Sequence, residues 1–79
     1  MEKDFAMLVL NSCFRSSREL GETACMVKEF SSEKEGKELK MQIALAMAEI
    51  GAVTQYIYRL HPDLESRVDE AIEKYGRLS

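Results

Sequence analysis

The sequence predicts an all-α fold, in which a long antiparallel helical hairpin and a short third helix form a three-helix bundle. Apolar residues recur at three- and four-residue steps through most of the chain, which places them on one face of a helix. No stretch alternates apolar and polar residues for long enough to form a strand. The single proline lies between two of the periodic segments. With 79 residues, 46% of them hydrophobic, residues 1–79 are expected to form one domain.

A first helix is predicted over about residues 4–30. Its apolar stripe is interrupted by two serines and consists of Ala6, Val9, Cys13, Leu20, Ala24 and Val27. The helix is expected to end before Ser32, because Ser32-Glu33-Lys34-Glu35 fits a capping box. In that motif the serine hydroxyl accepts a hydrogen bond from the N–H group three residues further on. The glutamate side chain accepts one from the serine N–H.

A second helix is predicted over about residues 33–60 and has the strictest periodicity of the three. Its apolar stripe consists of Leu39, Ile43, Ala46, Ile50, Val53, Ile57 and Leu60. We expect this stripe to face the first helix, because short joints make neighbouring helices antiparallel. Gly36 falls in the first turns, where glycine costs up to about 1 kcal/mol relative to alanine and favours fraying. A longer joint, with the helix beginning only after Gly36, is the alternative.

A third helix is predicted over about residues 62–75. Pro62 disfavours helical geometry at His61 and fits the first position of a new helix. Asp63 and Glu65 follow in its first turn, where carboxylates complement the positive end of the helix dipole. Gly76 supplies a stop signal at the other end. This helix is too short to cover more than half of the hairpin.

Self-association is predicted from the wide apolar arc of the helix at 33–60, which is typical of a buried helix. Two neighbours within one chain leave part of that arc uncovered, and a two-fold homodimer is the commonest way to cover it. We therefore expect the bundle to dimerise into a larger helical bundle. Exposed apolar patches mark protein contacts, and the candidate partner-binding residues are Met7, Leu10, Phe14, Met41, Leu45, Ala52 and Tyr56.

Glu49 is the only charged residue between Lys40 and Arg59. A carboxylate in an apolar flank is costly to bury without a partner. In the antiparallel hairpin, position 49 lies level with the region of Arg15 and Arg18. The sequence therefore predicts an ion pair of Glu49 with one of these arginines, either between helices of one chain or between two subunits.

A second pattern favours a different function. Glu19-x-x-Glu22 and Glu35-x-x-Glu38 place paired carboxylates on helix faces, and Mg²⁺ is bound by such oxygens together with water and phosphate. Paired acidic motifs of this kind are similar to those of the all-α nucleotide pyrophosphohydrolases. The second motif departs from them, since it ends in Glu38 rather than Asp and Glu35 is used by the cap. The chain is therefore not assigned to that family.

Composition excludes other partners and cofactors. The net charge of −3 argues against nucleic acid and anionic membranes, which attract a positive surface. Cys13 and Cys25 would lie about 18 Å apart in one helix, too far for a disulfide. With one histidine and no CxxC motif, no structural metal site or other cofactor is expected.

The sequence also contains no Ser–His or Cys–His pair at a credible spacing and no Gly-rich phosphate loop. We therefore expect no catalytic residues. The prediction is a small cytoplasmic helical protein that acts as a non-catalytic, self-associating protein-interaction or regulatory module, whose partner is itself or another protein. The alternative is the small Mg-dependent nucleotide hydrolase that would use the Glu-x-x-Glu pairs.

Overall fold

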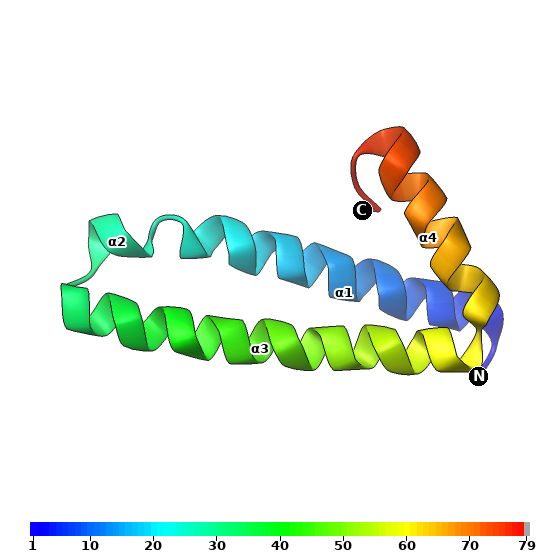
Figure 1. Ribbon diagram of the computed structural model, residues 1–79, viewed down its shortest axis with the longest axis horizontal. Helices are drawn as coiled ribbons and strands as arrows, with labels where there is room; N and C mark the ends of the chain where they lie inside the picture. The colour runs from blue at the N-terminus through cyan, green and yellow to red at the C-terminus, as the bar shows by residue number, and fades with distance from the viewer. Residues whose placement is uncertain (79) are drawn as a thin grey trace.

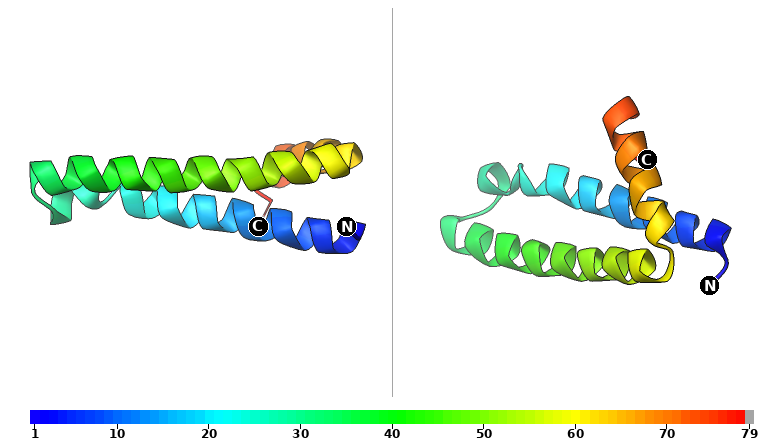
Figure 2. Two further views of the ribbon diagram at one scale, coloured as in Figure 1. Left: turned by 90° about the horizontal axis from the view of Figure 1, so that it is seen from below. Right: turned by 45° about the vertical axis from the view of Figure 1, so that its right-hand side comes forward.

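The computed structural model describes residues 1–78. Over that range it contains four helices and no strand, which confirms the all-α prediction. The helices are α1 (Lys3–Ala24), α2 (Val27–Phe30), α3 (Glu33–Leu60) and α4 (Pro62–Tyr75). The long helices α1 and α3 lie antiparallel and side by side, and α2 closes one end of this hairpin (Figure 1). At the other end α4 rises steeply from the hairpin instead of lying along it (Figure 2).

The helix predicted over residues 4–30 is divided at Cys25 and Met26, so the prediction of one continuous helix is wrong. The N–H of Met26 donates to the carbonyl of Thr23, three residues back, at 3.0 Å. The hydroxyl of Thr23 donates to the carbonyl of Glu19 at 3.0 Å, a bond that competes with the helical pattern and bends helices. The tightened turn redirects α2, and Val27 becomes buried.

The capping box predicted at the start of α3 is present. The N–H of Glu35 donates to the Ser32 hydroxyl oxygen at 3.2 Å, and the Ser32 N–H donates to Glu35 Oε1 at 3.0 Å. Hydrogen bonding of the Glu35 carboxylate to the Ser32 backbone, and in second place to the Ser32 side chain, lowers the pKa of Glu35 below its ordinary value. The cap therefore stabilises the carboxylate form of Glu35.

Gly36 is a packing residue and not only a helix-weakening one. It is buried, and a Cβ built there would lie 3.3 Å from the Ser31 hydroxyl oxygen and 3.5 Å from Val27 Cγ1. The absence of a side chain lets α2 approach the backbone of α3. The joint at residues 31–32 is therefore held by close packing as well as by its cap.

The core of the protein lies at the end of the hairpin where α4 begins. Its buried side chains come from α1, α3 and α4 and are Ala6, Leu10, Ile57, Leu64 and Val68. Partly buried hydrophobic residues surround them: Met7, Val9, Phe14, Tyr58, Ile72 and Leu78. None of the residues at 11–26 or 37–56 is fully buried. The middle of the hairpin is thus a two-helix layer with little core of its own.

We predict that Gly36→Leu lowers the free energy of unfolding by about 1–3 kcal/mol, because the added side chain must displace Val27 and Ser31. The matched control is Gly51→Leu on the same helix, where a Cβ would meet nothing within 4 Å. That control is expected to raise the free energy of unfolding by up to about 1 kcal/mol, since leucine forms helix better than glycine. Urea denaturation followed by circular dichroism measures both. Equal effects of the two substitutions would contradict the close packing at Gly36.

A second prediction concerns the stability of the fold at low pH. The pKa of Glu35 is lower in the folded chain than in the unfolded one. The contribution of its carboxylate to the stability of the fold is therefore fully present above the unfolded pKa. It is lost as the pH falls through the folded pKa. Thermal midpoints measured from about pH 6 down to about pH 3 should therefore fall less in Glu35→Gln, which keeps a capping side chain, than in the wild type. An identical pH profile in the two proteins would show that the cap does not depend on the carboxylate.

Candidate functional site

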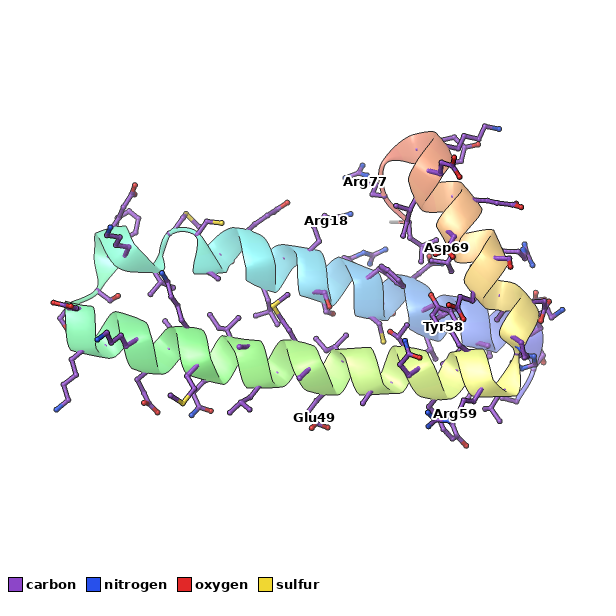
Figure 3. The ribbon with its side chains drawn as sticks, in the orientation of Figure 1. Arg18, Glu49, Tyr58, Arg59, Asp69 and Arg77 are labelled. Atoms are coloured by element: carbon purple, nitrogen blue, oxygen red, sulfur yellow. The ribbon has the colours of Figure 1, made fainter. Side chains whose placement is uncertain are left out.

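Helix α4 covers only one side of the hairpin. On α1 that side carries Phe14 and Arg18, which line a hollow together with Ile72 and Leu78. On α3 it carries Tyr58, whose pKa is raised by burial and by the nearby carboxylates of α4 (Figure 3). Residues two positions from Phe14 point to the opposite side of α1, because each residue turns a helix by about 100°. In the part of the chain that the structure describes, no helix covers that opposite side.

The uncovered side of α1 begins with two large hydrophobic residues. Phe5 and Leu8 are 54% and 59% exposed. They lie at one end of an apolar hollow between α1 and α3, whose other lining residues are Val9, Ser12, Cys13, Ser16 and Ile50. Ile50 of α3 lines this hollow with residues of α1 on both sides of Ser12, and the lining contains no residue of α4.

On α3 a second apolar row lies next to this hollow. The row consists of residues seven positions apart, Leu39, Ala46, Val53 and Leu60, and all of them are exposed. The prediction that this row faces the first helix is therefore wrong for Ala46, Val53 and Leu60, whereas Leu39 does line a hollow with Thr23 and Val27. The row that does face the first helix is Gly36, Ile43, Ile50 and Ile57, flanked by Met47 and Thr54. The reason is that Gly36 must meet α2 and Ile57 must enter the core, and these two contacts fix the rotation of α3 about its axis.

We call the uncovered surface the open face and define it by its residues on two helices. They are Phe5, Leu8, Ser12 and Ser16 of α1 and Leu39, Gln42, Ala46, Glu49, Val53, Tyr56 and Leu60 of α3. The open face runs along most of the hairpin. Among the residues so defined Glu49 is the charged one, while Glu35 and Glu38 border Leu39 and Gln42 at one end of the face. A surface of this kind suits contact with a protein rather than chemistry on a small molecule.

The extent of exposure is also unusual for the size of the chain. The accessible surface is 5910 Å², whereas a folded monomer of 9.0 kDa is expected to expose about 4,850 Å². The radius of gyration is 14.8 Å, compared with about 11.6 Å for a compact domain of this length. The single chain thus exposes about 1,000 Å² more than a compact protein of its mass.

The candidate partner-binding residues divide into three groups. Met41, Leu45, Ala52 and Tyr56 of α3 are exposed, and of these only Tyr56 belongs to the open face. Met7 and Phe14 are partly buried against the core. Leu10 is completely buried, so its assignment to a partner surface is wrong. It faces α3 and α4 at the point where these two helices meet α1.

The ion pair predicted for Glu49 does not form within the chain. Glu49 points away from α1, and Arg18 points away from α3 (Figure 3). Among residues 1–78 the salt bridge that forms joins Lys3 and Asp63 at the junction of α1 and α4. An ion pair of Glu49 with an arginine of a second subunit stays a prediction.

The four glutamates of the alternative hydrolase are exposed on α1 and on the first turns of α3: Glu19, Glu22, Glu35 and Glu38. Within residues 1–78 no group of three or more His, Cys, Asp or Glu side chains is placed to hold a metal ion. Glu35 is already bound to the Ser32 N–H. The geometry therefore brings these carboxylates to the surface without making them converge.

The candidate partner-binding residues omitted five large residues of the open face: Phe5, Leu8, Leu39, Val53 and Leu60. The signal that could have found those of α3 is the seven-residue spacing from Leu39 to Leu60. The two rows are offset by three residues, as the a and d positions of one heptad seam are. Here the row from Gly36 to Ile57 is the more buried of the two, and the row from Leu39 to Leu60 lies at the exposed edge of the seam.

Comparisons with protein-family models, with curated proteins and with solved structures find no match to this chain. Among residues 1–78, none of the helices is both long and apolar enough to cross a membrane.

Proposed function

We propose that this chain is a non-catalytic protein-interaction module that works by self-association, as a homodimer joined through the open face. The observation that carries the proposal is the exposure of large apolar side chains on two neighbouring helices. Phe5, Leu8, Val53 and Tyr56 are all between two fifths and three fifths exposed. Side chains of this size are worth about 1.5–3 kcal/mol each when they are buried completely.

The area argument supports the same conclusion. A stable protein–protein interface buries about 800 Å² on each partner. The surface that this chain exposes beyond expectation for its mass is slightly larger than that. One homodimer interface on the open face would therefore bring the accessible surface of each chain to the range of compact proteins.

The small core makes pairing useful for stability as well. Among residues 1–78, six hydrophobic residues are buried, and five of them lie at one end of the hairpin. Chains of this length rarely obtain enough stability from a single core and are often supported by oligomerisation. Pairing on the open face would cover the middle of the hairpin, where the chain has no third helix.

The proposal includes a cytoplasmic location, because Cys13 and Cys25 are free thiols and free thiols suit a reducing compartment. A different protein could also occupy the open face. In that case the purified chain alone would be monomeric, which the following experiment detects.

Val53→Asp should reduce the mass measured by sedimentation equilibrium from that of two chains to that of one. The carboxylate would be buried without a partner at the dimer interface but remains in water in the monomer. Gln55→Asp is the matched control, since it puts the same residue on the same helix at a position pointing away from the open face. It is expected to leave the dimer mass unchanged. Retention of the dimer by Val53→Asp, or a monomeric wild type at about 100 μM, would contradict the proposal.

A further inference from the structure

The open face has an apolar end and a polar middle, and this pattern restricts how a second copy can bind. Phe5 and Leu8 lie at the end of the face that also carries Tyr56 and Leu60. Ser12 and Ser16 lie in the middle, level with the region of Ala46 and Glu49, because the hollow places Ile50 beside Ser12. Two copies must bring apolar residues onto apolar residues and leave Glu49 with a counter-charge.

A two-fold dimer can be formed in two ways when each subunit contributes a layer of two helices. If the axis runs along the hairpin, α1 of one subunit lies on α3 of the other, and residues keep their level. If the axis runs across the hairpin, α3 lies on α3 and α1 on α1, and the two ends of the face exchange places. The residues that meet differ completely between these arrangements.

The axis along the hairpin matches the residues of the face. Both helices rise by the same distance per residue and run in opposite directions. A residue that lies n positions before Ser12 is therefore level with the residue that lies n positions after Ile50. The partner's Phe5 then falls within about one residue of the level of Tyr56, and the partner's Leu8 within about one residue of Val53. The partner's Ser16 falls level with Ala46. Apolar residues meet apolar residues, and the small serine meets the small alanine.

The axis across the hairpin does not match them. The apolar row of α3 runs from Leu39 to Leu60, and its midpoint lies between Glu49 and Ile50. Two copies centred there bring Glu49 next to its own equivalent, and like charges in a contact repel each other. The same arrangement places Phe5 and Leu8 opposite the region of Ser16 and Glu19. It therefore mismatches both helices of the face.

Arg15 provides the counter-charge in the first arrangement. It is exposed on the outer edge of α1, beside the open face, and it forms no salt bridge within residues 1–78. The partner's Arg15 would lie within about two residues, or about 3 Å of helix rise, of the level of Glu49. An arginine side chain spans this offset easily. Both side chains lie at the outer edge of the face, as do the interhelical ion pairs that set partner orientation in coiled coils.

We propose, building on the homodimer proposed above, that its two-fold axis runs along the hairpin. In this dimer α1 of each subunit packs on α3 of the other, and Glu49 pairs with the partner's Arg15. The dimer is then an antiparallel four-helix layer structure with both α4 helices at one end. The ion pair occurs twice by symmetry, so every change in it acts twice on the dimer.

The test is a charge exchange followed by sedimentation equilibrium at low salt, with circular dichroism to verify that each variant is folded. Glu49→Arg alone and Arg15→Glu alone should each weaken the dimer on the order of tenfold or more, because each creates two like-charge contacts. The double variant carrying both substitutions in one chain should recover to within about threefold of the wild-type dissociation constant. Glu49→Gln should also weaken the dimer.

The outcomes separate the two proposals. A wild type that is monomeric overturns the homodimer itself. A dimeric wild type whose double variant shows the summed loss of the single variants overturns the pairing of Glu49 with Arg15. A dimer that becomes tighter in Glu49→Gln indicates that Glu49 meets its own equivalent, and it overturns the axis along the hairpin in favour of the axis across it.

Discussion

The structure depends on one constraint, which is that α3 carries two apolar rows and its own chain covers only one of them. The row of Gly36, Ile43, Ile50 and Ile57 faces α1, because glycine is needed against α2 and isoleucine is needed in the core. The neighbouring row from Leu39 to Leu60 is exposed as a consequence. α4 cannot cover it, since that helix packs on the opposite side of the hairpin.

Much of the fold could be predicted because its signals are local. The capping box at Ser32 and the proline at the start of α4 act through hydrogen bonds and backbone angles within a few residues. The division of the first helix at Cys25 could not be predicted in the same way. Local hydrogen bonds at Thr23 and Met26 accompany it, but the packing of Val27 beside Gly36 is a contact between segments whose relative position is set only once the hairpin has formed.

The existence of an uncovered apolar surface could be predicted from the sequence, but most of the residues that form it could not. The wide apolar arc of α3 predicted an uncovered surface, and Tyr56 does lie on it. Assigning individual residues required the rotation of each helix about its axis, and a difference of one position transfers a residue from surface to core. Leu10 shows this, because it was expected at the surface and is completely buried. Glu49 was expected to pair with an arginine of its own chain or of a second subunit. The pair within the chain does not form, because the rotation that puts Ile50 toward α1 turns Glu49 away from it (Figure 3).

The central claim is that a second copy completes the fold, and it is tested most directly by the thermal midpoint of unfolding as a function of protein concentration. A chain whose native state is stabilised by pairing is governed by mass action. The account therefore predicts that the midpoint of the wild type rises steadily when its concentration is raised from about 1 to about 100 μM. A midpoint that does not change over this range, with cooperative unfolding throughout, would show that the single chain is stable with its open face in water.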